Sequence, residues 1–186
     1  MTKHVLLIQG AGTGACEEDK KLAASLTKSL GTDYEVHYPA MVDEENAPYE
    51  QWTQQIEQEL AAMQGPIILV GHSVGASVLI KWLSETEVRT PIGGIFLTAT
   101  PFWGGNGWLY EGYEELALPE EPATKLPTGV SIFLYHCRDD ETVPFDHLAH
   151  YAQVLPQATV RELAAGGHQL NNDLSEVARD IKTLHA

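Results

Sequence analysis

Residues 65–75 read GPIILVGHSVG, and this stretch decides the fold. Residues 67–70 form a short, continuous apolar run rich in β-branched side chains, which is typical of a parallel strand covered on both faces. Gly71, Ser73 and Gly75 then fit the pattern G-x-S-x-G, in which a sharp turn exposes the serine hydroxyl between a strand and a helix. The two glycines leave room where a Cβ atom would collide with neighbouring backbone. The stretch therefore predicts a buried strand, a strained turn with a candidate nucleophile, and a helix.

Composition predicts one soluble domain spanning residues 1–186, because 186 residues with 44% apolar side chains suit a folded chain with a sizeable core. The formal net charge of −15 disfavours nucleic acid and anionic membranes as partners. Two cysteines do not make a disulfide framework, and a reducing compartment is the default. Four apolar residues before Gln9 are too few for a signal peptide, and no run approaches the ~20 residues of a membrane span. We therefore expect a cytoplasmic protein.

The pattern of apolar residues alternates between strands and helices along the whole chain. Strands are expected at residues 5–8, 34–38, 67–70, 92–98, 130–135 and 158–163, and helices at about 17–30, 46–63, 74–85, 146–154 and 173–184. Strands that alternate with helices imply a parallel sheet with helices on both faces. The predicted fold is α/β: a three-layer α/β/α sandwich around a mostly parallel six-stranded sheet, without a large lid domain.

An aromatic-rich insert at about 101–127 interrupts this alternation and has no clear period. A segment of this length inside a compact domain is usually functional or disordered, and its aromatic residues argue against disorder. Trp103, Trp108 and Tyr110 are candidates for the wall of an apolar substrate pocket. A hydrophobic plug over the sheet edge is the alternative interpretation.

A serine nucleophile needs a histidine base and a carboxylate that orients it. Asp140 follows the fifth expected strand and His168 follows the sixth, so both should lie with Ser73 at the carboxyl edge of the sheet. The order serine, acid, histidine is that of the serine hydrolases built on such sheets. Asp139 and Glu141 are neighbours that periodicity alone does not separate from Asp140. The rival base, His136, precedes the acid rather than following it.

Two main-chain N–H groups should bind the oxyanion, from Val74 after the nucleophile and from Ala11 after the first strand. Residues 10–15 also fit the dinucleotide pattern G-x-G-x-x-G/A. The acidic start of the following helix would repel a pyrophosphate, and no ribose-binding acid ends the second strand. We therefore favour the oxyanion interpretation. Since neither H-E-x-x-H nor ligand-spaced cysteines occur, no metal site and no cofactor are predicted.

The motifs resemble those of the α/β-hydrolase superfamily, and more narrowly its small serine hydrolases of the retinoblastoma-binding-protein type and their bacterial relatives. The resemblance covers nearly the whole chain and rests on residues 9–12 (QGAG), 38–41 (YPAM), 71–75 (GHSVG), 140–144 (DETVP) and 167–168 (GH). In the superfamily the acid stands before x-x-V-P, which implies Asp140 rather than Asp139. The resemblance also implies a sheet that lacks the first two strands of the full superfamily. One departure is Gln9-Gly10, where the superfamily often has His-Gly.

The sequence thus predicts a carboxylesterase-like serine hydrolase that cleaves a small-molecule ester, or else a thioester or an amide, through an acyl-enzyme. The alternative is a protein-binding module on a hydrolase scaffold with little or no catalysis. The sequence does not itself indicate a protein partner.

Overall fold

The computed structural model describes residues 2–104 and 112–184. At its centre is a six-stranded sheet in the order β2-β1-β3-β4-β5-β6, in which all neighbouring strands pair in parallel. The strands are β1 (Lys3–Ile8), β2 (Tyr34–His37), β3 (Ile67–His72), β4 (Ile92–Thr98), β5 (Ile132–Cys137) and β6 (Thr159–Leu163). The α/β class and the six-stranded parallel sheet predicted from the alternation are confirmed.

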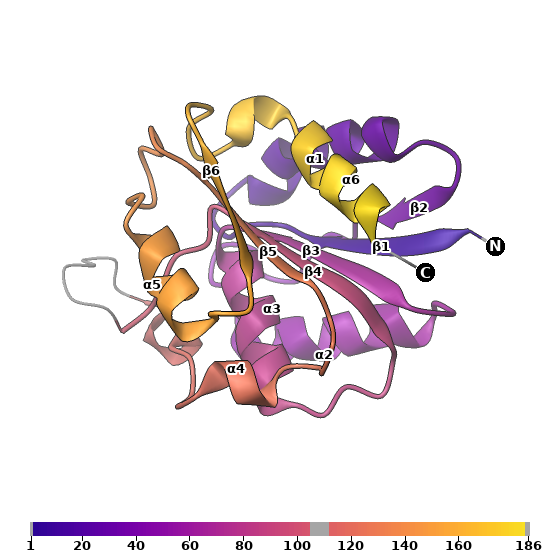
Figure 1. The fold of residues 1–186 in the computed structure, drawn as a ribbon, viewed down its shortest axis with the longest axis horizontal. Coiled ribbons are helices and arrows are strands. Elements are labelled where there is room, and N and C mark those ends of the chain that lie inside the picture. The colour runs from indigo at the N-terminus through magenta and orange to yellow at the C-terminus, as the bar shows by residue number, and fades with distance from the viewer. Residues whose placement is uncertain (1, 105–111, 185–186) are drawn as a thin grey trace.

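Helices cover both faces of this sheet, as Figure 1 shows. One layer contains α1 (Ala15–Leu30) and α6 (Ser175–Thr183), and the other contains α2 (Tyr49–Ala61), α3 (Val74–Glu85) and α5 (His147–Val154). Successive side chains of a strand point to opposite faces, so Leu6 and Ile8 pack into the layer of α2 and α3, whereas Val5 and Leu7 pack under α1 and α6. Burial on both faces explains why the central strands read as continuous apolar runs.

The insert at 101–127 contains short regular elements that the sequence pattern did not predict. A 3₁₀ turn, η1, spans Glu114–Leu116, and a one-turn helix, α4, spans Pro122–Lys125. Leu116 is buried in the main core, so this part of the insert packs onto the domain. Elements of three or four residues are shorter than a helical period needs to become visible in a sequence.

The topology brings the carboxyl ends of β1, β3, β5 and β6 to one edge of the sheet, and the loops that leave this edge carry the predicted site residues. Among the described residues, no helix is both long and apolar enough to cross a membrane.

Candidate active site

The turn after β3 holds Ser73 in a strained conformation, with φ 52° and ψ −126°. This backbone region is costly for a residue with a side chain and persists only where the surroundings enforce it. The glycines on either side permit the turn. A Cβ atom on Gly71 would lie 2.6 Å from the Cα atom of Ala76, and one on Gly75 would lie 2.0 Å from the carbonyl oxygen of Gln9. The expectation that a side chain would not fit at either glycine is confirmed.

Three predicted site residues form a hydrogen-bonded chain. The Nε2 atom of His168 lies 2.9 Å from the Oγ atom of Ser73, and its Nδ1 atom lies 3.0 and 3.1 Å from the carboxylate oxygens of Asp140. A carboxylate only accepts, so Nδ1 of His168 donates to it and Nε2 is left to accept the serine hydroxyl proton. The structure thus brings together groups that are 95 and 28 residues apart along the chain.

Asp140 is held as a carboxylate. Its side chain is completely buried, its Oδ1 atom accepts from the N–H groups of Thr142 and Val143, and its Oδ2 atom lies 3.2 Å from Nε2 of His136. Burial by itself raises the pKa of Asp140, but the hydrogen bonds of His136 and His168 outweigh it and hold this pKa well below its usual range. A negative charge therefore remains beside His168 throughout the neutral range.

The neighbours of Asp140 have different contacts. Asp139 accepts hydrogen bonds from the N–H groups of Gly166 and Gly167, both at 2.9 Å, and Glu141 accepts from the main-chain N–H of His168 at 3.1 Å. Both acidic groups hold the loop that carries His168, whereas Asp140 contacts the imidazole. The rival histidine, His136, is buried on β5 against Asp140, and its Nε2 atom also lies 2.9 Å from the carbonyl oxygen of Val143.

A second carboxylate–imidazole pair lies directly behind the hydrogen-bonded residues Ser73, His168 and Asp140. The Nδ1 atom of His72 is 2.8 Å from Oδ2 of Asp19, and its Nε2 atom is 3.0 Å from the carbonyl oxygen of His168. Both partners only accept, so His72 must donate from both ring nitrogens, which requires the imidazolium form. Burial alone lowers the pKa of His72, but the charge and hydrogen bond of Asp19 raise it above its ordinary value. Asp19 and His72 thus form a buried ion pair.

Asp19 connects three segments of the site. Besides His72, its carboxylate accepts hydrogen bonds from the N–H of Gly10, at 2.8 Å, and from the side-chain amide of Gln169, at 3.1 Å. Burial opposes ionisation of this carboxyl, yet His72 and the hydrogen bonds lower its pKa below the usual value. The N-terminal loop, the serine turn and the His168 loop are therefore tied to one charge.

Sequence reasoning missed this pair, because His72 occupies the variable position of G-x-S-x-G. A signal was nevertheless present in the helix that follows the first loop. Asp19 precedes Leu22, Ala23 and Leu26 by three, four and seven residues, so it belongs to the buried stripe of α1. A carboxylate on a buried stripe needs a partner.

The two predicted oxyanion donors belong to residues that line one cavity with Ser73 and His168, namely Ala11 and Val74. The loop that carries Ala11 is held by Glu44, whose side chain accepts from Gly14, Cys16 and the Gln9 amide, and whose carbonyl oxygen accepts from Gly12. Gln9, where the superfamily often has histidine, is completely buried and accepts from the N–H of Met41. The oxyanion role of Ala11 and Val74 stays a prediction.

The same contacts bear on the dinucleotide pattern. In dinucleotide-binding folds the pyrophosphate occupies the N-terminus of the first helix. Here the Glu44 carboxylate binds the N–H groups of Gly14 and Cys16, each at 2.8 Å. A negatively charged group of the chain itself thus takes the place that a phosphate would need.

The cavity has a volume of about 270 Å³ and is lined mainly by apolar atoms. Trp103 lines it, as the pocket prediction requires, and its ring lies 5.4 Å from that of Tyr113, which also lines it. The indole N–H of Trp103 donates to the Oγ atom of Ser77 at 3.2 Å, which fixes the ring. The other two predicted pocket residues, Trp108 and Tyr110, lie outside the described residues. Glu18, an exposed residue, also belongs to the lining.

His147, at the start of α5, is a buried histidine. It is 5% exposed, and its Nδ1 atom accepts the main-chain N–H of Phe102 at 2.7 Å. Burial lowers the pKa of His147 to about 4, so the ring is neutral and can accept at this nitrogen. It fastens the start of the insert to α5.

The six-stranded parallel sheet and the serine turn after β3 place this protein in the α/β-hydrolase fold class. Residues 17–176 match the family model described as serine hydrolase, which covers most of the chain, and the chain therefore belongs to the serine hydrolase family. No curated protein matches the sequence.

Solved structures of hydrolases are similar to this chain in fold. The ydeN gene product of B. subtilis has a TM-score of 0.71 at 19% identity and 98% coverage of both chains. The serine hydrolase CCSP0084 from Cycloclasticus zankles has a TM-score of 0.74 at 14% identity, with 98% of this chain and 88% of that chain covered. Est1E from Butyrivibrio proteoclasticus has a TM-score of 0.68 at 14% identity, with 97% and 86% covered. These matches support the fold, and the narrower retinoblastoma-binding-protein type stays a prediction.

Proposed function

We propose that this chain is an esterase that hydrolyses a small ester through an acyl-enzyme on Ser73. The observation that carries the proposal is the 2.9 Å contact between Nε2 of His168 and Oγ of Ser73, with the ionised Asp140 behind the imidazole. A serine hydroxyl becomes a useful nucleophile only when such a base can take its proton.

The chemistry follows from these contacts. Ser73 Oγ bonds to the ester carbonyl carbon while its proton passes to His168, and the carbonyl oxygen becomes an oxyanion for the main-chain donors of Ala11 and Val74. Collapse breaks the bond to the leaving alcohol, which takes the proton from His168. Water then attacks the acyl-enzyme, giving its proton to His168, and the free acid and Ser73 are regenerated. Asp140 stabilises the imidazolium formed in each half-reaction.

The cavity favours a short, neutral acyl group. Its volume, about 270 Å³, is near the lower limit of ligand pockets, which span roughly 300–1,000 Å³. Trp103 and Tyr113 supply apolar walls, and the Glu18 carboxylate in the lining disfavours substrates that carry a negative charge. We expect p-nitrophenyl acetate and butyrate to be better substrates than the palmitate ester or a hemisuccinate.

A fluorophosphonate probe tests the proposal, because it phosphonylates only a serine with an activated hydroxyl. The wild-type chain should gain one adduct, mapped to Ser73 by mass spectrometry, and Ser73→Ala should gain none. Ser29→Ala, which changes a serine on α1 outside the cavity lining, should label fully. If the folded wild-type chain stays unlabelled and cleaves none of the esters, it is a binding module on a hydrolase scaffold.

A further inference from the structure

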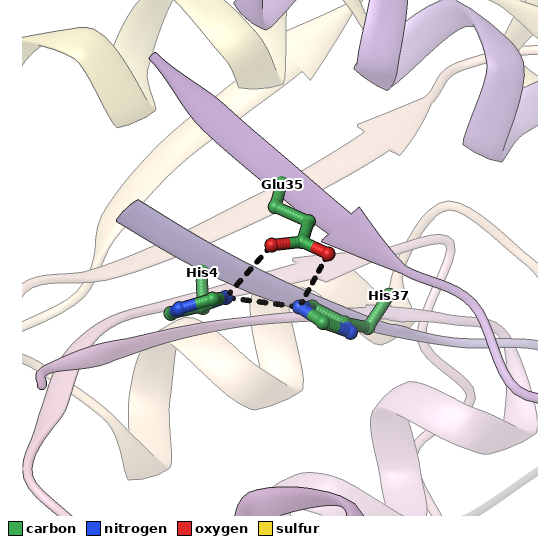
Figure 2. A group of neighbouring side chains, drawn as sticks. All are labelled: His4, Glu35 and His37. Carbon is green, nitrogen blue, oxygen red and sulfur yellow. Dashed lines mark hydrogen bonds and ion pairs between the residues drawn. The ribbon is translucent and has the colours of Figure 1, made fainter. Parts of the chain in front are cut away.

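A second group of chemically active side chains lies on β1 and β2, and none of its members lines the cavity. It consists of His4 from β1 and of Glu35 and His37 from β2. Figure 2 shows the two imidazole rings and the carboxylate directed toward one another, with each carboxylate oxygen facing one ring. The sequence patterns for metal sites do not detect this group, because its members come from two strands.

Sheet geometry explains why the three side chains meet. His4 pairs with Glu35 and Leu6 pairs with His37 in the parallel register of β1 and β2. Glu35 and His37 are two residues apart, so their side chains share one face of the sheet. The two histidine side chains are 20% and 26% exposed and Glu35 is 58% exposed, which leaves the group half-buried and open to solvent.

The separations of the three polar atoms are those of ligands around one ion. Nδ1 of His4 lies 2.9 Å from Nε2 of His37, and the carboxylate oxygens of Glu35 lie 3.6 Å from the former and 3.9 Å from the latter. A single proton between the two nitrogens accounts only for the shortest of these distances. At zinc–ligand bond lengths of about 2.0–2.2 Å, tetrahedral ligands are roughly 3.3 Å apart, and the observed values bracket this spacing.

From this geometry we infer that His4, Glu35 and His37 form a binding site for a divalent transition-metal ion of the Zn²⁺ type. Two imidazole nitrogens and one carboxylate suit such an ion, whereas Mg²⁺ and Ca²⁺ prefer oxygen ligands alone. One carboxylate leaves a net positive charge on the occupied site, which the chain's charge of −15 favours. The described residues supply three ligands, so water can complete the coordination.

An ion at this position would connect an edge strand to its neighbour. In the sheet order β2 lies at the end and, among the strands that the structure describes, pairs with β1 alone through a strand of only four residues. An ion that binds the folded pairing and not the unfolded chain stabilises the fold by mass action. The site is therefore structural in this inference and separate from ester cleavage.

The test is a Zn²⁺ titration of the full chain, purified without a polyhistidine tag, followed by isothermal calorimetry and by the visible absorption of Co²⁺ as a zinc substitute. We expect one ion per chain. His37→Gln and Glu35→Gln should each weaken binding at least about tenfold, since even the loss of a residue that only hydrogen-bonds to a metal ligand costs about 10–100-fold in affinity. His150→Gln and Glu50→Gln, which remove a half-buried histidine and an exposed carboxylate elsewhere, should bind as the wild type does.

A second readout separates this site from metal bound by the catalytic groups. Zn²⁺ should raise the midpoint of thermal unfolding for the wild type and for Asp140→Asn, but not for His37→Gln. His37→Gln should also keep wild-type fluorophosphonate labelling, which shows that it folds. The inference is overturned if the wild type shows no saturable binding, or if binding survives in both His37→Gln and Glu35→Gln; the pair of rings is then only a hydrogen-bonded contact.

Discussion

Replacement of Asp19 by asparagine tests whether the buried pair behind the catalytic histidine is ionic. Asparagine has nearly the same shape as aspartate but carries no charge, so the packing of α1 is preserved. The side chains of Asp19 and His72 are each 2% exposed, so solvent does not screen the interaction between them. The variant leaves His72 without its counter-ion in a buried position.

The expected loss of stability depends on whether His72 keeps or loses its proton in the variant. Removing one partner of a buried ion pair costs about 3–5 kcal/mol when the remaining charge stays. His72 can instead lose its proton, and the cost is then one charge-assisted hydrogen bond, about 1.5–3 kcal/mol. We therefore expect Asp19→Asn to lower the free energy of unfolding by ~2–4 kcal/mol near pH 5.

The stability difference between the wild type and Asp19→Asn should depend on pH if the pair is ionic, whereas a purely steric effect would not depend on pH. In the wild type the pKa of His72 is raised above 6.5, so its pairing stabilises the fold fully below pH 6.5 and is lost as the pH rises through the native value. The pKa of Asp19 is lowered below 3.8, so its contribution is present above pH 3.8 and is lost as the pH falls through its own native value. The difference between wild type and variant should thus be largest between pH 4 and 6.5 and shrink at alkaline pH.

Urea unfolding at pH 5 and pH 9 measures this difference, with Glu18→Gln as the matched control. Glu18 is exposed on the same turn of α1, and its loss should change stability by less than about 0.5 kcal/mol at either pH. A constant difference at both pH values, or a loss under about 1 kcal/mol near pH 5, would refute an ionic pair. Turnover should fall as well, because His72 holds the main chain of His168.

Two further predictions concern the acid and the serine turn. Asp140→Asn should lower kcat by roughly 10³–10⁴-fold with the fold intact. Asp139→Asn keeps an oxygen that can accept from the loop N–H groups and loses only the charge, so it should lower kcat less than about tenfold; equal losses would contradict the assignment of the acid. Gly75→Ala should destabilise the protein by about 3 kcal/mol in urea unfolding, the upper end of the usual cost of overpacking, because the added carbon would lie 2.0 Å from a main-chain oxygen. Gly93→Ala, whose nearest neighbour would be 3.4 Å away, should stay within ~1 kcal/mol, and similar losses at both glycines would disprove the steric argument.

The sequence by itself determined the order of strands and helices and the edge at which the site forms. Burial of the sheet on both faces requires continuous apolar strands, and glycine is the residue that leaves space around the serine turn. The strands and the turn can therefore both be predicted from the local sequence. Because the carboxyl ends of parallel strands share one edge, Ser73 and His168 could be placed together from their positions after β3 and β6.

Only the tertiary structure decided which polar groups are partners. Asp139, Asp140 and Glu141 are adjacent, and periodicity does not separate them, although the resemblance implies Asp140. In the structure the Asp140 carboxylate points to the imidazole, while the other two carboxylates bind the loop main chain. Asp19 and His72 are 53 residues apart, and nothing local to either predicts their contact.

His4, Glu35 and His37 meet through the register of two parallel strands, and His147 is buried by packing of the insert against α5. Such contacts depend on side-chain direction and strand register over distances of tens of residues. Periodicity describes one element at a time and carries no record of either, so only the folded chain can reveal them.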